Sequence, residues 1–279
     1  MTPPVVVGVD GSASSLRAVD FAADEAALRG APLRLVHASL WERYEGSSLA
    51  EDLGRPTERV TAEDILRTAE HRAALRRPGL EVSLDVLPEE PEYALVREGR
   101  EASLLVVGTR GRGGLAELLL GSVSLAVAAR AVCPVIVVRG DHEPQGRVVV
   151  GIGERGAALD FAVEEARLRH AALDAVRAWR CPARESTDHP LLAGEPARLH
   201  EQHAVEALDR ALKNAPATVN RRTVEGPART VLLAASHGAD LLVVGARRHP
   251  GHLGLQLGRV AHAVLHHSPC AVAVVPEPE

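Results

Sequence analysis

Short apolar runs alternate along the whole chain with longer segments in which apolar residues recur at helical spacing. Continuous runs of Val, Leu and Ile are typical of strands that are buried on both faces of a parallel sheet. The pattern therefore predicts an α/β fold with helices on both faces of the sheet. In the first half we expect strands near 4–9, 33–39, 80–87, 103–108 and 134–139, and helices near 13–30, 57–77, 91–101 and 119–131.

The second half of the chain repeats the first half. Four segments recur in the same order, with 5–9 matching 148–152, 21–26 matching 161–166, 104–108 matching 241–245, and 133–138 matching 270–275. A linker near 141–146 separates the copies, which predicts two domains at 1–140 and 146–279. In the second copy we expect strands near 147–152, 173–179, 217–224, 240–245 and 271–275, and helices near 156–171, 195–214, 227–237 and 257–267.

Each copy predicts a five-stranded parallel sheet of order 3-2-1-4-5. In open sheets of this kind, ligands bind beyond the carboxyl ends of the strands where the winding direction reverses, here between strands 1 and 4. In the first copy, strand 4 ends in a loop with Gly108, Gly111, Gly121 and Ser122, directly before a helix. Unpaired backbone N–H groups at the start of a helix favour an anion such as phosphate. We expect Gly108 and Gly111 to adopt backbone angles that other residues resist, and Ser122 and Ser124 to add hydroxyl donors.

This glycine loop is neither a Walker loop nor a Rossmann fingerprint, because no Gly-Lys-Ser/Thr follows and the glycine spacing differs. The run from Val107 to Ser124 instead resembles the ATP-binding signature of the universal stress protein family. The resemblance covers nearly the whole chain. It implies two tandem Rossmann-like domains of the adenine nucleotide alpha hydrolase type.

The resemblance also implies which residues hold the nucleotide. An Asp at the end of strand 1 accepts hydrogen bonds from the nucleoside in this family, and the end of strand 2 borders the base. A turn with a helix N-cap is the simpler interpretation of Asp10, Gly11 and Ser12 alone. The nucleoside pocket is assigned to Gly8, Val9, Asp10 and Ala38, and the phosphate loop to Val107, Gly108, Arg110, Gly111, Arg112, Gly113, Gly121, Ser122, Val123 and Ser124.

The second copy departs from the signature at the decisive positions. Gly153 and Glu154 replace Asp10 and Gly11, while Arg248 and Arg259 replace Gly111 and Ser122. We expect this half to be a scaffold that has lost nucleotide binding, with a guanidinium-based anion site as the alternative.

Two histidine groups in the second copy suggest other chemistry. The run 249–252 matches the His-x-Gly-His of nucleotidyltransferases, but it follows the fourth strand rather than the first. His262 and His266 have a spacing that permits a metal pair, although a surface cluster without metal is the expected state.

Composition limits the partners of the chain. The net charge is −5 with a single lysine, Lys213, which argues against nucleic-acid binding. The three cysteines have no zinc or disulfide spacing, no charged-then-apolar leader is present, and no apolar run is long enough to cross a membrane. We therefore expect a cytoplasmic protein that does not bind membranes.

Three functions are compatible with the sequence. The expected one is a nucleotide-dependent regulator of the stress response, with ATP, with or without Mg²⁺, bound once per chain in the first domain. The alternatives are a structural or interaction protein without nucleotide, and a weak ATPase or nucleotidyl-transfer enzyme of the related fold. No catalytic residue is assigned, because no general base or acidic pair is placed for phosphoryl transfer, and any ATP hydrolysis is expected to be slow or absent.

The fifth strand of each copy lies at a sheet edge in the expected order, and proteins normally cover such apolar edges. Single-domain members of the family commonly dimerise through this edge. The resemblance thus implies an intramolecular pseudo-dimer with strands 135–138 and 272–275 at its seam, alone or within a homodimer. We also expect a protein partner, whose identity the sequence does not give.

Overall fold

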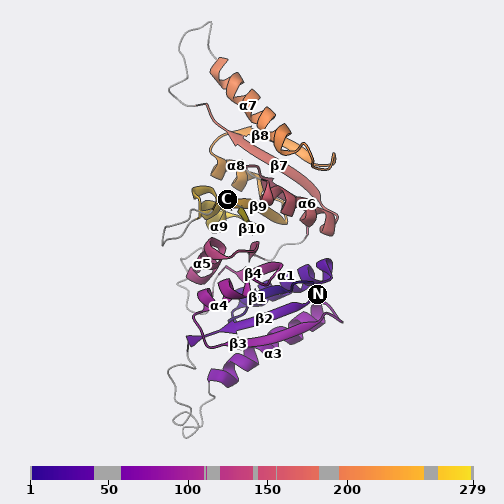
Figure 1. Cartoon of the computed structure of the whole chain (residues 1–279), viewed down its shortest axis with the longest axis vertical. Helices are drawn as coiled ribbons and strands as arrows, with labels where there is room; N and C mark the ends of the chain where they lie inside the picture. The colour runs from indigo at the N-terminus through magenta and orange to yellow at the C-terminus, as the bar shows by residue number, and fades with distance from the viewer. Residues whose placement is uncertain are drawn as a thin grey trace. The chain divides into compact units, whose positions relative to one another are not determined.

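The computed structural model describes residues 2–40, 58–109, 111, 120–140, 144–154, 156–181, 195–247 and 257–277. These residues form two compact units, one containing strands β1 to β5 and the other containing β6 to β10 (Figure 1). Each unit is an α/β fold with a parallel sheet, as the alternation of apolar runs and amphipathic segments predicts.

The first unit has the strand order β3-β2-β1-β4-β5, and every described pairing is parallel. Val5 pairs with Leu33 of β2 and with Leu104 of β4, so β1 is the central strand. Its elements are β1 (Val5–Gly8), α1 (Ala13–Arg29), β2 (Leu33–Ala38), α3 (Glu58–Arg76), β3 (Val82–Leu87), α4 (Pro91–Glu98), β4 (Leu104–Gly108), α5 (Ser122–Arg130) and β5 (Val135–Val138).

The second unit repeats this topology with the order β8-β7-β6-β9-β10. The register repeats too, because Gly151 pairs with Val176 just as Gly8 pairs with Val36. Its elements are β6 (Arg147–Gly151), α6 (Ala157–Arg169), β7 (Ala172–Trp179), α7 (Glu195–Ala211), β8 (Asn220–Glu225), α8 (Ala228–Ala235), β9 (Leu241–Arg247), α9 (Arg259–His267) and β10 (Ala271–Glu277).

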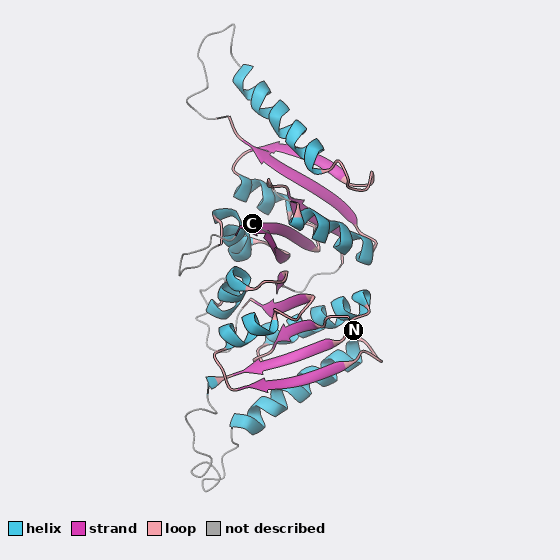
Figure 2. Ribbon diagram, viewed as in Figure 1, coloured by secondary structure: helices cyan, strands magenta, loops and turns pink. Residues whose placement is uncertain are grey.

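Helices cover both faces of each sheet (Figure 2). In the first unit α1 packs with α3 on one face and α4 packs with α5 on the other, as right-handed crossovers in this strand order require. The side chains of Val5, Val6, Val7, Leu104 and Leu105 are fully buried between the two layers. Strands of this kind carry no polar face, which explains why they appear in the sequence as continuous apolar runs.

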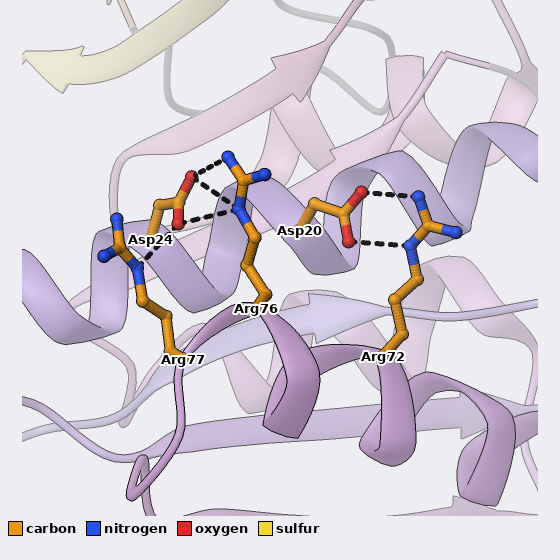
Figure 3. A network of polar contacts seen from close by, with 5 residues as sticks. All are labelled: Asp20, Asp24, Arg72, Arg76 and Arg77. Carbon is orange, nitrogen blue, oxygen red and sulfur yellow. Dashed lines mark hydrogen bonds and ion pairs between the residues drawn. The ribbon is translucent and has the colours of Figure 1, made fainter.

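Two arginines of α3, and Arg77 just after its end, bind carboxylates of α1 (Figure 3). Arg72 donates two hydrogen bonds to Asp20, at 2.5 and 2.6 Å. Asp24 accepts from both Arg76 and Arg77, each with a closest distance of 2.8 Å, and the hydrogen bond to Asp24 raises the pKa of Arg76. Paired, partly exposed charges of this kind fix the register of two helices more than they add stability.

Each unit has an ion pair between its second and third strands. The acidic and basic residues occupy opposite strands in the two units. In the first unit Arg34 of β2 binds Asp85 of β3 at 2.6 Å, and its guanidinium also lies 2.7 Å from Glu98. In the second unit the equivalent positions hold Asp174 of β7 and Arg222 of β8, 3.6 Å apart.

Asp174 accepts further hydrogen bonds, from Arg147 at 2.6 Å and from Asn220 at 2.9 Å. Burial by itself would raise the pKa of Asp174, but the hydrogen bonds from Asn220 and Arg147 and the positive charges of Arg147 and Arg222 outweigh it. The pKa of this carboxyl therefore lies below its ordinary value.

The elements expected from the sequence are confirmed, with corrections at several ends. Helices α4 and α7 end at Glu98 and Ala211 rather than near 101 and 214. Helix α5 begins at Ser122 rather than near 119, because Gly121 N–H bonds to Thr109 O and keeps Gly121 extended. Strand β8 begins at Asn220 rather than 217, because Val219 N–H closes a turn onto Pro216 O. Strand β10 continues to Glu277 rather than ending at 275.

Candidate functional site

The first unit contains a pocket of about 400 Å³ beyond the carboxyl ends of β1 and β4. The sheet order reverses between these two strands, which is where open α/β sheets place their ligands. Its volume lies within the range of about 300–1,000 Å³ that is usual for small-molecule sites. The described lining consists of Gly8, Val9, Asp10, Ser15, Val36, Ala38, Pro91, Leu95, Val107, Gly108, Gly111, Gly121, Ser122, Val123 and Ser124.

The structure brings the described candidate residues together around this pocket. They come from the end of β1, the end of β2, the end of β4 and the first turn of α5, and they are Gly8, Val9, Asp10, Ala38, Val107, Gly108, Gly111, Gly121, Ser122, Val123 and Ser124. Candidates Arg110, Arg112 and Gly113 lie outside the described residues.

Asp10 serves both the pocket and the start of α1. Its Oδ1 accepts from Ser12 N–H at 3.0 Å, which closes a tight turn, and Gly11 in this turn has a φ of 78° that favours glycine. Ser12 then caps α1, with its Oγ accepting from Ser15 N–H at 3.1 Å. The turn-and-cap interpretation is therefore correct as local structure, and it holds the Asp10 carboxylate at the pocket wall.

Glycine is required at two positions of the loop because other atoms approach closely. A Cβ at Gly108 would lie 2.5 Å from Ser14 Oγ and 2.7 Å from Ser14 O, and one at Gly111 would lie 2.5 Å from Asp10 Oδ2. The expectation of special backbone angles is wrong for Gly108, whose φ lies outside the left-handed region. The missing side chains instead let the start of α1 approach the end of β4 and let Gly111 approach the Asp10 carboxylate.

The first turn of α5 presents its backbone to the pocket. The first hydrogen bond of this helix is donated by Leu125 N–H to Gly121 O, so the N–H groups of Ser122, Val123 and Ser124 have no acceptor within the helix. Ser122 is exposed at the pocket wall. The expectation of a hydroxyl donor at Ser124 is corrected, since its Oγ donates to Gly108 O at 2.6 Å and ties α5 to the end of β4.

Four lining residues were not found from the sequence: Ser15, Val36, Pro91 and Leu95. Ser15 Oγ accepts from Asp10 N–H at 3.3 Å and supports the turn after β1. Val36 pairs with Gly8 at the end of β2. Pro91 and Leu95 belong to the first turns of α4, far from the signature in the sequence, and only the expected position of this helix beside β1 could have indicated them.

The second unit has a smaller pocket, of about 220 Å³, at the equivalent end of its sheet. Its described lining is Gly151, Ile152, Gly153, Glu154, Val176, Ala178, Ala228, Leu232, Val244, Gly245, Val260 and Glu277. Arg259 is exposed at the first position of α9 and does not belong to this lining. Arg248 and the run 249–252 lie outside the described residues.

The remaining chemical candidates provide no further site in the part of the chain that the structure describes. His262 and His266 stack on α9 with ring centroids 4.4 Å apart. No group of three His, Cys, Asp or Glu side chains among the described residues is placed to hold a metal ion. The cysteines are free thiols, and burial raises the pKa of Cys270. None of the described helices is long and apolar enough to cross a membrane.

Comparison with known proteins agrees with this geometry. The sequence model of the universal stress protein family matches residues 1–139 and again 146–276. The chain belongs to the universal stress protein family. Universal stress protein Rv2005c of Mycobacterium tuberculosis is 35% identical over 285 residues, covering 94% of this chain and 93% of its own length.

A solved structure that aligns over the full length shows the same fold. A universal stress protein from Archaeoglobus fulgidus aligns over 100% of both chains with a TM-score of 0.71, at 16% identity. Another universal stress protein from that organism, solved in complex with dAMP, matches 50% of this chain and 98% of its own length at 28% identity, with a TM-score of 0.37.

Proposed function

We propose that this universal stress protein is a nucleotide-dependent regulator that binds one adenine nucleotide in the pocket of its first unit. The expected ligand is ATP, with or without Mg²⁺. One observation carries the proposal. The Asp10 carboxylate and the uncapped first turn of α5 line the same pocket, which lies where the sheet order reverses between β1 and β4. We further infer that the two domains span 1–140 and 146–279.

The two sides of the pocket fit the two ends of a nucleotide. Val36, Ala38 and Leu95 form an apolar wall of suitable chemistry for a base. On the other side, backbone N–H groups of 122–124 lie at the positive end of the α5 dipole, where phosphate is favoured. Asp10 lies between these sides and supplies an acceptor for sugar hydroxyls.

We assign regulation to this site rather than a reaction. Among the described lining residues Asp10 alone has a titratable side chain, and its Oδ1 already accepts from Ser12 N–H. When bound, the nucleotide stabilises the arrangement of the ends of β1 and β4 relative to the first turn of α5. Occupancy thus shifts a conformational equilibrium that a partner can detect, by as much as the nucleotide's affinity differs between the two states.

Calorimetry with ATP, ADP and AMP on the purified chain tests the proposal, together with mass spectrometry of any nucleotide released on denaturation. The expected result is a stoichiometry of one nucleotide per chain. The absence of binding at millimolar nucleotide would contradict the proposal, and so would two equivalent sites for the same nucleotide.

A further inference from the structure

The pocket of the second unit keeps the apolar half of the first pocket. A Cβ built on Gly8 would lie 2.8 Å from Leu95 Cδ1, and one built on Gly151 would lie 2.8 Å from Leu232 Cδ1. The helix that follows the third strand therefore approaches the central strand equally closely in both units. The matching walls consist of Val9, Val36, Ala38, Leu95 and Val107 in the first unit and Ile152, Val176, Ala178, Leu232 and Val244 in the second.

The other half of the second pocket is rebuilt, beginning with a shorter helix. Helix α1 begins about two turns before Phe21, whereas α6 begins only about one turn before the matching Phe161. The residue at the N-cap of α6 is Gly156, which has no side chain to cap the helix. The missing turn would leave both an empty volume beside β9 and uncapped N–H groups at the start of α6.

Glu277 at the end of β10 occupies this place. Its side chain is buried, with 6% of the residue exposed, and its carboxylate accepts from Ala157 N–H at 3.3 Å and from Ala158 N–H at 3.4 Å. A Cβ on Gly245 would collide with Glu277 Oε1, just as a Cβ on the matching Gly108 would collide with Ser14. A carboxylate thus stands in the second unit where a serine hydroxyl stands in the first.

We propose that the pocket of the second unit binds the base and sugar of an uncharged nucleoside and excludes the corresponding phosphate esters. The ligand class rests on the function proposed for the first unit, because the shared apolar wall is the side assigned to the base. The volume of about 220 Å³, against about 400 Å³, corresponds to a ligand without a phosphate chain.

Charge explains the exclusion of phosphate. The N–H groups of 259–261 at the start of α9 have no acceptor within their helix, as in α5, but Glu277 and Glu154 both line the second pocket, so an incoming phosphate meets two carboxylates there. A cation is not required in exchange, because the N-terminal dipole of α6 and two backbone N–H groups already compensate the charge of Glu277. The site therefore distinguishes a nucleoside from its monophosphate.

Calorimetry with adenosine and AMP on the unmodified full chain is the first test. The expected result is two adenosine molecules but one AMP per chain. In the variant Ala178→Phe the phenyl ring fills the second pocket. The number of adenosine molecules bound per chain should fall to one, and the number of AMP molecules should stay at one. In the matched variant Ala38→Phe the number of adenosine molecules bound per chain should fall to one, and AMP binding should disappear.

The variant Glu277→Gln then tests the cause of the selectivity. The amide keeps the shape of the side chain, and its single oxygen still accepts from one of the two N–H groups at the start of α6, but it removes the charge. In the Ala38→Phe background, where AMP binding is otherwise below detection, Glu277→Gln should raise AMP affinity at least tenfold above the detection limit, while adenosine affinity changes less than twofold. Two AMP per unmodified chain would overturn the proposal, as would a single adenosine per chain that Ala38→Phe abolishes, or an AMP affinity unchanged by Glu277→Gln.

Failure of the function proposed for the first unit gives a different result. In that case AMP does not bind the unmodified chain, and adenosine binds once in a manner that Ala178→Phe abolishes and Ala38→Phe preserves. Circular dichroism of each variant, compared with the unmodified chain, establishes that the added phenyl rings leave the fold intact.

Discussion

The two units place a pocket at the same end of equivalent strands, yet the pockets differ in what surrounds an anion. In the first unit the starts of α1 and α5 approach the pocket with serine hydroxyls and uncapped N–H groups. In the second unit a carboxylate from the last strand caps the shortened helix α6. The comparison teaches that the sheet determines where a ligand can bind, whereas the residues just beyond the strands determine its charge.

The largest expected effect comes from Gly121→Glu at the N-cap of α5. The backbone there has φ −76° and ψ 154°, which any residue adopts, so the added side chain costs little stability. It places a negative charge against the proposed phosphate position, and ATP affinity should fall at least about 100-fold, or about 3 kcal/mol. Calorimetry with ATP measures this loss.

The matched control is Gly258→Glu at the N-cap of α9, where φ is −58° and ψ is 154°. It adds the same side chain to the second unit and should leave ATP affinity unchanged. Unaltered ATP binding by a folded Gly121→Glu chain would mean that the loop after β4 is only a connector.

An intermediate effect is expected from alanine at the two equivalent glycines of β4 and β9. In Gly108→Ala the new Cβ meets Ser14 O at 2.7 Å, and this backbone atom cannot move without shifting α1. In Gly245→Ala the new Cβ meets the side chain of Glu277, which can rotate away. Gly108→Ala should therefore lower the free energy of unfolding by about 1–3 kcal/mol, and Gly245→Ala by less.

Urea denaturation of both variants, followed by circular dichroism, compares these losses. If Gly245→Ala destabilises the chain as much as Gly108→Ala, then the Glu277 side chain is held as rigidly as the backbone of Ser14 and does not rotate away.

The smallest effect is a pH dependence that belongs to the second unit. Because the pKa of Asp174 is depressed in the fold, its contribution to stability is fully present above the pKa of an unfolded Asp, about 3.9, and is lost as the pH falls through the lower folded value. Asp174→Asn should lower the melting temperature by about 2–4 °C at pH 7, since one such hydrogen-bonded charge contributes about 1 kcal/mol. The difference should shrink below about pH 4.

Thermal melts of both proteins between pH 3 and 7 measure this effect. A difference that stays constant over the whole range would show that Asp174 stabilises the unit through shape rather than charge.

Much of the fold and of the first pocket could be predicted because both follow from strand ends. Continuous apolar runs locate the strands, and the end of a parallel strand carries its residues to one edge of the sheet. Asp10 and Gly108 could thus be placed at one pocket without knowledge of any side-chain contact, whereas Ala38 was assigned through the resemblance to the family. Leu95 could not, because no local motif indicates which turn of α4 approaches β1.

The residues that sequence reasoning missed, or gave another role, act through contacts with distant parts of the chain. The hydroxyl of Ser124 is an apparent ligand in the sequence, but its hydrogen bond to Gly108 O depends on how α5 returns to β4. Glu277 follows Pro276 at the end of an apolar strand and resembles a solvated terminal residue. Its burial results from a missing helix turn that lies 120 residues earlier, at Ala157.

The exchanged ion pair of the two sheets has a consequence for how a duplicated chain assembles. Tandem domains of similar sequence tend to misfold by exchanging equivalent strands. If β7 took the place of β2 beside β3, Asp174 would face Asp85, and if β2 took the place of β7 beside β8, Arg34 would face Arg222. Each crossed pairing brings like charges together and is therefore less stable than the native pairing. This difference favours pairing within each repeat as the protein folds.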